Sequence, residues 1–239
     1  MTAAKVRGNG RVTGLRLPRL PRLDGRASAD RPIVETDPRR VTRQRAVLLV
    51  AGAVGLAVAT IRGRGRLMDD RLFGTLNTRY EHPVLDAFFR SVTELGSLWA
   101  SVGAAGVMAA RGRRRAAVDA LGAAVAMWLM GQGLKQTFRR VRPYDARLPR
   151  PIRLLIGRPL GTSWPSAHPA TFLAFATVAA RDLEVPRSGR RALAGLAGVV
   201  AASRVYLGVH YPADVVGGLL LGRAVADVWS REVSPHVVH

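Results

Sequence analysis

Three short blocks of the sequence carry cationic, hydroxyl and imidazole side chains at spacings that suit phosphate chemistry. The blocks are Lys135 with Arg142-Pro143, then Pro165-Ser166-Ala167-His168, and then Ser203-Arg204 with His210 and Asp214. A phosphoryl group spreads negative charge over its non-bridging oxygens, so catalysis of its transfer depends mainly on positioning and electrostatic stabilisation. Lys135, Arg142 and Arg204 can supply that stabilisation, because Arg meets two oxygens at once and Lys acts as a compact point charge. Ser166 can add a hydroxyl donor.

Two histidines, His210 and His168, can divide the work of hydrolysis. One neutral imidazole can attack phosphorus to give a covalent intermediate, while a second, protonated imidazole gives a proton to the departing oxygen. Asp214 follows His210 by four residues, and Pro212 between them suits the first position of a helix. We therefore expect Asp214 in the first turn of that helix, where it can fix the tautomer of the His210 ring. His168-Pro169 likewise opens an apolar run, and a helix starting there would direct free N–H groups at an anion.

The three blocks resemble the signature of the type 2 phosphatidic acid phosphatase superfamily, which includes bacterial polyprenyl pyrophosphate phosphatases and vanadate haloperoxidases. The motifs occur in order over residues 135–214. The resemblance implies that His210 is the nucleophile, Asp214 its partner and His168 the acid for the leaving group. It implies a phosphate site made by Lys135, Arg142, Ser166, Ala167 and Arg204. It also implies metal-independent hydrolysis of a lipid phosphate or pyrophosphate without a cofactor.

Ala167 departs from the family pattern, which usually has Gly between the Ser and the His of the second block. If that position requires a positive φ or a very close backbone approach, the methyl group costs on the order of 1 kcal/mol. We expect slower turnover or a narrower substrate range in that case.

Six apolar segments follow the N-terminal region and are interpreted as membrane spans. They cover residues 46–61, 98–110, 116–134, 168–180, 192–209 and 212–229. Several are shorter than the roughly 20 residues of an ordinary span, so a buried helix in a soluble bundle is the alternative for each. The number of segments and their many small residues favour the membrane. The expected fold is all-α, a six-transmembrane-helix bundle with a four-to-five-helix catalytic core of the type 2 phosphatidic acid phosphatase kind.

Charge is unevenly distributed along the 239 residues, which are 48% hydrophobic and carry a formal net charge of +21. Residues 1–45 are rich in Arg and Pro and are expected to form a disordered cytoplasmic tail. Residues 46–230 form the predicted membrane-embedded domain, and residues 231–239 a C-terminal tail. The basic tail fits a solvated segment or an arm on anionic lipid. Membrane lipids are therefore expected partners and nucleic acid is not, while the oligomeric state is left open.

The positive charge also indicates an orientation. With the tail in the cytoplasm, the clusters 111–115 and 181–191 also fall inside, and the long loop 135–165 with its motif residues falls outside. Arg62, Arg64 and Arg66 oppose this arrangement, as do the further arginines of the loop, some of which can attract anionic substrates. The predicted location is the bacterial inner (plasma) membrane, with several spans and an extracytoplasmic active site.

Residues 67–97 mix apolar and charged side chains and fit either an interfacial lip for lipid entry or ordinary packing against the bundle. Two other functions compete with the lipid phosphatase. One is a haloperoxidase-like protein that binds vanadate in the same pocket. The other is a non-catalytic protein whose basic surface binds membranes or nucleic acid. Under this hypothesis the occurrence of the three blocks in one chain is a coincidence.

Overall fold

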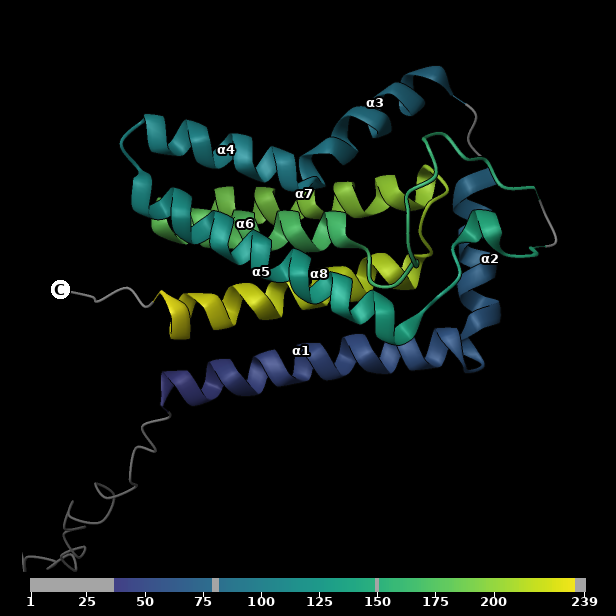
Figure 1. Ribbon diagram of the computed structural model, residues 1–239, viewed down its shortest axis with the longest axis horizontal. Helices are drawn as coiled ribbons and strands as arrows, with labels where there is room; N and C mark the ends of the chain where they lie inside the picture. Colours follow the sequence, from purple (N-terminus) through teal and green to yellow (C-terminus); the bar gives the residue numbers. More distant parts are fainter. Residues whose placement is uncertain (1–36, 79–81, 149–150, 235–239) are drawn as a thin grey trace, which may run out of the picture. The chain divides into compact units, whose positions relative to one another are not determined.

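The structure, a computed structural model, describes residues 37–78, 82–148 and 151–234, which are mostly helical apart from the long connection between Phe138 and Ala167. The long helices are α1 (Pro38–Ile61), α2 (Gly65–Thr78), α3 (Pro83–Thr93), α4 (Leu98–Ala110), α5 (Arg114–Phe138), α6 (Ala167–Asp182), α7 (Arg187–Tyr206) and α8 (Pro212–Val228) (Figure 1). Short turns are η1 (Glu94–Gly96), η2 (Pro143–Asp145) and the π-helical η3 (Trp229–Val233). No strand occurs among these residues, which confirms the all-α prediction.

Helix α1 begins at Pro38, so residues 38–45, the last eight of the predicted disordered tail, are helical. The Asp37 carboxylate accepts a hydrogen bond from the backbone N–H of Arg39 at 2.9 Å, and Pro38 fits the first turn. Arg43 and Arg45 then pair with acidic residues of η3 and α8, at 3.0 Å from Glu232 and 3.3 Å from Asp227. These contacts extend the helix into the segment assigned to the tail. The rest of the predicted tail, residues 1–36, and residues 235–239 lie outside the described residues.

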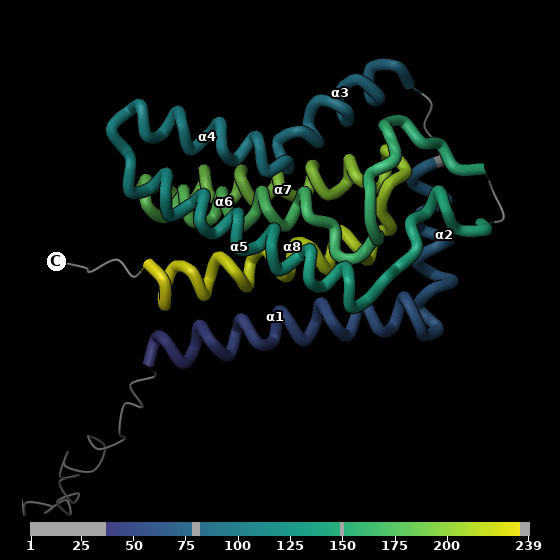
Figure 2. Tube along the Cα trace, viewed as in Figure 1, coloured from purple at the N-terminus to yellow at the C-terminus, as the bar shows by residue number. Residues whose placement is uncertain are grey.

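Helix α6 packs against α5, α7 and α8, while α1 runs alongside α8 (Figure 2). The start of α6 lies very close to α8, because Gly218 and Gly222 leave room for its backbone. A Cβ atom on Gly218 would collide with the carbonyl oxygen of Ser166, and one on Gly222 with that of Ala170. The two glycines therefore fix the distance between the second and third sequence blocks.

The described part of residues 67–97, which is 67–78 and 82–97, contributes to α2, α3 and η1, and it packs partly against the bundle, while the lipid-entry lip stays a prediction. Phe73 is buried with its ring 5.4 Å from that of Tyr211, and Phe89 packs on Tyr206 at 4.5 Å between centroids. Leu67 and Phe88, in contrast, are exposed. One face of this segment packs on α7 and α8, and the other offers apolar side chains to the surroundings.

Two of the described helical segments are long and apolar enough to cross a membrane, Pro38–Ile61 and Arg114–Asp145. Helix α4 is apolar but has only 13 residues. Helices α6 and α8 have 16 and 17 residues, and α7 carries four arginines, at positions 187, 190, 191 and 204. The count of six spans therefore stays a prediction.

Candidate functional site

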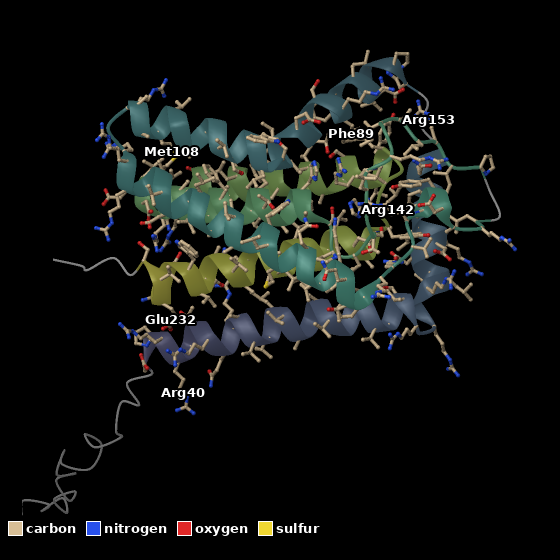
Figure 3. The ribbon with its side chains drawn as sticks, in the orientation of Figure 1. Arg40, Phe89, Met108, Arg142, Arg153 and Glu232 are labelled. Carbon is tan, nitrogen blue, oxygen red and sulfur yellow. The ribbon has the colours of Figure 1, made fainter. Side chains whose placement is uncertain are left out.

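The three sequence blocks meet at one end of the bundle, where α5 and α7 end and α6 and α8 begin (Figure 1). A cavity of about 420 Å³ opens there. Its lining includes Lys135 from α5, Arg142 from the following loop, Ala167 and His168 from α6, Arg204 from α7 and His210 from the turn before α8. Arg142 is labelled in Figure 3. The structure thus brings together residues that are up to 75 positions apart (210 minus 135).

The His210 ring lies between a carboxylate and a guanidinium. Its Nδ1 is 3.5 Å from Asp214 Oδ2 and 3.4 Å from Ser163 Oγ, and its Nε2 is 3.3 Å from Arg142 Nη1. A guanidinium only donates, so this contact requires a lone pair on Nε2 and places the ring proton on Nδ1, toward Asp214 and Ser163. Burial, with Arg142 and Arg204 nearby, lowers the pKa of His210 well below its usual value. Burial and these cations therefore favour the neutral imidazole.

Asp214 is held from three sides and is fully buried. It accepts hydrogen bonds from the backbone N–H of Tyr211 at 2.9 Å, from Ser163 Oγ at 2.5 Å and from Arg140 Nη1 at 2.6 Å. The Tyr211 contact is the helix cap that Pro212 predicts, with Asp214 at the third position of α8. The carboxylate has little freedom to leave the His210 ring.

Arg140 and Asp69 form a supporting pair that the sequence analysis missed. Arg140 Nη2 is 2.5 Å from Asp69 Oδ2, and Asp69 Oδ1 accepts from the backbone N–H of Ala213 at 2.9 Å. Arg140 is 6% exposed, and its guanidinium lies 4.1 Å from the centroid of the Tyr211 ring. Arg140 is one of the further arginines of the 135–165 loop, and its two terminal nitrogens are occupied by Asp214 and Asp69 inside the protein, so it is not one of those that can attract a substrate.

The remaining cations and hydroxyls of the cavity are only partly engaged. Arg204 Nη1 donates to Thr93 Oγ1 at 2.8 Å, while its buried Nε has no hydrogen-bond partner among the described residues. The hydroxyl of Thr171 is also buried without such a partner, and Thr171 lines the cavity one turn after His168, a residue that was not predicted from the sequence. Arg204 and Thr171 are therefore available to an anion in the cavity. The Ser166 hydroxyl is likewise buried without a partner, but Ser166 does not itself line the cavity.

Ala167 occupies the first position of α6, and it is not among the described residues with positive φ. The cost of a positive φ at this position therefore does not arise. Across the cavity, Gly96 approaches His168, and a Cβ atom added there would lie 2.7 Å from that of His168. The position that needs glycine is thus in η1, outside the sequence block.

The rim of the cavity is apolar and aromatic. Trp99 on α4 and Trp128 on α5 line it together with Leu160, and Trp99 and Leu160 are 82% and 95% exposed. A cationic floor with an apolar rim suits an amphiphile that has an anionic head.

We expect Arg140→Gln to lower kcat about tenfold or more with KM within about twofold, because it releases Asp214 but leaves the cavity cations in place. It should also lower the unfolding temperature, since removal of one partner from a buried ion pair costs about 3–5 kcal/mol. Steady-state kinetics and thermal unfolding in detergent measure both effects. Arg147→Gln, which changes an exposed arginine of the same loop, is the matched control. Unchanged kcat in Arg140→Gln contradicts the supporting role.

Comparison with known proteins adds evidence independent of this geometry. Residues 116–235 match the sequence profile of the PAP2 superfamily. The chain is 35% identical over 120 residues to decaprenylphosphoryl-5-phosphoribose phosphatase of Mycolicibacterium smegmatis, an alignment that covers 50% of this chain and 62% of that relative. It is 31% identical over 130 residues to the protein of the same name from Mycobacterium tuberculosis, covering 54% of this chain and 68% of that one.

Two crystal structures share the fold. A transmembrane PAP2 type phosphatidylglycerolphosphate phosphatase from Bacillus subtilis superposes with a TM-score of 0.63 at 23% identity, covering 78% of this chain and 94% of that one. LpxE from Aquifex aeolicus superposes with a TM-score of 0.58 at 28% identity, covering 66% and 92%. The arrangement of helices is therefore one known from solved proteins.

Proposed function

This chain belongs to the PAP2 superfamily, and we propose that it is an integral membrane phosphatase that removes the terminal phosphate from a polyprenyl-linked sugar phosphate. The convergence of two imidazoles and three cations on one cavity is the observation that carries the proposal. The relatives named for a decaprenylphosphoryl sugar phosphate support this substrate class. The apolar rim, made by α4, α5 and the loop before α6, fits a polyprenyl chain that continues into the surrounding lipid.

In the proposed mechanism, Lys135, Arg142 and Arg204 bind the non-bridging oxygens of the phosphate. The first N–H groups of α6 and the Ser166 hydroxyl add neutral donors. These contacts grow stronger as charge moves onto the oxygens in the transition state, which is the requirement for catalysis. The cationic lining attracts anions and would repel a divalent metal ion, so the mechanism is expected to proceed without one.

His210 then attacks phosphorus through Nε2, whose lone pair points to the Arg142 side of the cavity. The P–N bond forms while the bond from phosphorus to the leaving oxygen breaks, and His168 gives its proton to that oxygen. Asp214 stabilises the positive ring through the Nδ1 proton. In the second step water attacks phosphorus, the P–N bond breaks and His168 takes the proton from the water. Phosphate leaves and both rings return to their starting states.

The location in the proposal is the bacterial plasma membrane, with the cavity facing the extracytoplasmic side. Helices α1 and α5 have the length and apolarity for spans, and the fold is that of transmembrane phosphatases. The end of the bundle opposite the cavity carries the arginines at 111–115 and 187–191, in agreement with the preference of positive charge for the cytoplasmic side.

The test is phosphate release by detergent-purified protein from four lipids, with and without EDTA. The lipids are a polyprenyl-linked sugar phosphate, undecaprenyl pyrophosphate, phosphatidic acid and phosphatidylglycerol phosphate. We expect the highest kcat/KM for the sugar phosphate and the same rate with EDTA. Equal or higher kcat/KM for phosphatidic acid contradicts the substrate class. Loss of activity in EDTA contradicts the mechanism, and no release from any lipid contradicts the phosphatase itself.

A further inference from the structure

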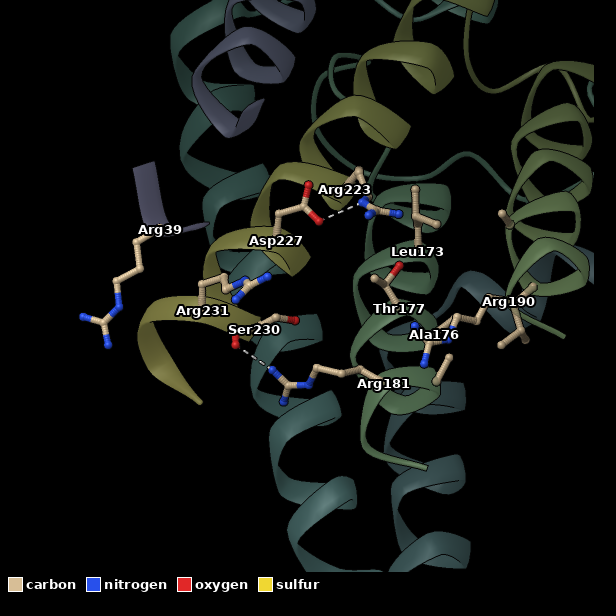
Figure 4. A pocket seen from close by; sticks show the side chains of 13 residues that line it. Arg39, Leu173, Ala176, Thr177, Arg181, Arg190, Arg223, Asp227, Ser230 and Arg231 are labelled. Atoms are coloured by element: carbon tan, nitrogen blue, oxygen red, sulfur yellow. Dashed lines mark hydrogen bonds and ion pairs between the residues drawn. The ribbon is translucent and has the colours of Figure 1, made fainter. Parts of the chain in front are cut away.

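A second cavity, of about 560 Å³, lies at the opposite ends of α6, α7 and α8 from the candidate active site (Figure 4). Five arginines and one carboxylate belong to its lining: Arg39, Arg181, Arg190, Arg223, Arg231 and Asp227. The lining therefore has a formal net charge of +4, five positive charges and one negative. None of these residues takes part in the proposed hydrolysis.

Two of the five arginines are used in holding the helices together. Arg223 Nε donates to Asp227 at 2.8 Å, and Arg45 on α1 lies 3.3 Å from the same carboxylate. Arg181 pairs with Asp182 at 2.5 Å and donates to the carbonyl oxygens of Ser230 and Ser234. The only acid in the lining is therefore already shared between two arginines.

Arg190 and Arg231 have no carboxylate within ion-pair distance in the described part of the chain. Arg190 Nε donates to the carbonyl of Val185 at 2.7 Å. Figure 4 shows the two residues on different elements around the same space, Arg190 on α7 and Arg231 on η3. Two uncompensated guanidiniums facing one enclosed space favour an anion there, since each can meet two oxygens of a phosphate.

The other wall of the cavity is apolar and comes from the neighbouring faces of α6 and α7. Leu173 and Ala176 lie on α6, and Leu193 and Ala194 on α7. Free phosphate makes no use of such a wall, whereas the glycerol and upper acyl chain of a lipid do. The first residues of α1, the more apolar candidate span, are at the same end, so the cavity lies at the depth of lipid headgroups in the proposed membrane location.

We propose that this cavity binds the phosphate headgroup of an anionic phospholipid, with Arg190 and Arg231 on the phosphate and the acyl chains against α6 and α7. The bound lipid would join α1, α7 and η3 at the side of the membrane opposite the active site. The inference rests on the membrane location in the proposed function but not on the assigned chemistry. The expected ligand of this cavity is phosphatidylglycerol, a phosphodiester. It is chemically distinct from the substrate of the active site, which is a phosphomonoester.

The test compares two double variants of the full chain in detergent by native mass spectrometry. Phosphatidylglycerol and phosphatidylcholine with the same acyl chains are the probes. The first variant, R190Q/R231Q, removes the charges of Arg190 and Arg231, which have no carboxylate partner. The matched control, R113Q/R114Q, removes two exposed arginines from the α4–α5 connection at the same end of the bundle. Phosphate release from the lipid substrate is measured on each preparation to show that it is folded.

We expect the wild-type chain to retain phosphatidylglycerol in preference to phosphatidylcholine. R190Q/R231Q should lose about tenfold or more in affinity for phosphatidylglycerol, while the control stays within about twofold. Equal retention of both lipids, an equal loss in both variants, or no loss in R190Q/R231Q overturns the proposal. Displacement of phosphatidylglycerol by millimolar inorganic phosphate assigns the cavity to free phosphate and also overturns it. Phosphate release that persists in these cases leaves the proposed enzymatic function standing.

Discussion

His210→Ala is expected to reduce phosphate release to near background, a loss of roughly 10⁴-fold or more. Removing a covalent nucleophile leaves only binding and electrostatic stabilisation to act on the substrate. Protein mixed with labelled substrate and quenched within one turnover should contain an acid-labile, alkali-stable phosphate adduct in the wild type and none in the variant. Loss of both turnover and adduct, with normal folding in detergent, is the result that identifies His210 as the attacking group.

His82→Ala is the matched control, because His82 is exposed at the start of α3 and its ring only accepts a hydrogen bond from the backbone of Val84. This control should keep its rate. His210→Ala that still forms the adduct would show that another side chain attacks phosphorus. An adduct absent from the wild type under all quench conditions would favour direct attack by water, with His210 as its base.

The local part of the site could be predicted from the sequence because neighbours along the chain determine it. Asp214 follows His210 by four positions with Pro212 between them, so a helix starting at Pro212 brings the two side chains together whatever the rest of the fold. The same reasoning placed His168 at the start of α6. The family signature then supplied the long-range part, since it requires the blocks to share one cavity.

The support of Asp214 could not be predicted in this way. Arg140 reaches Asp69 and Asp214 across 71 and 74 positions of the chain, and no periodic pattern connects the three. Arg140 also follows another arginine and precedes Arg142, so composition gives no reason to single it out. Burial distinguishes it, and burial at a loop position depends on how α2 packs over the start of α8.

Helix boundaries and membrane spans show a second limit of prediction from the sequence. The pattern of apolar residues placed the first helix at 46–61, but the capping carboxylate and the ion pairs to α8 extend it to Pro38. Arginines near the start of a helix are equally common in an irregular tail. Whether they are helical depends on their ion-pair partners elsewhere in the fold, which the sequence does not identify. Small residues are equally ambiguous, because Gly218 and Gly222 bring two helices together in either a membrane or a soluble bundle.

His168→Ala is expected to lose about 10²- to 10⁴-fold in rate on a lipid phosphate, whose alkoxide leaving group needs a proton. On p-nitrophenyl phosphate the first step should be affected much less, because that leaving group departs as a stable anion. The second step also uses His168, as the base for water, so the variant should release a burst of nitrophenol and accumulate the phosphate adduct. Rapid-mixing kinetics on both substrates measure the burst and the rates.

Equal losses on the two substrates without a burst would remove His168 from proton transfer and leave it a role in binding alone. The combination of a burst, an accumulated adduct and leaving-group dependence separates acid–base chemistry at His168 from a merely structural role, since misfolding lowers every rate together.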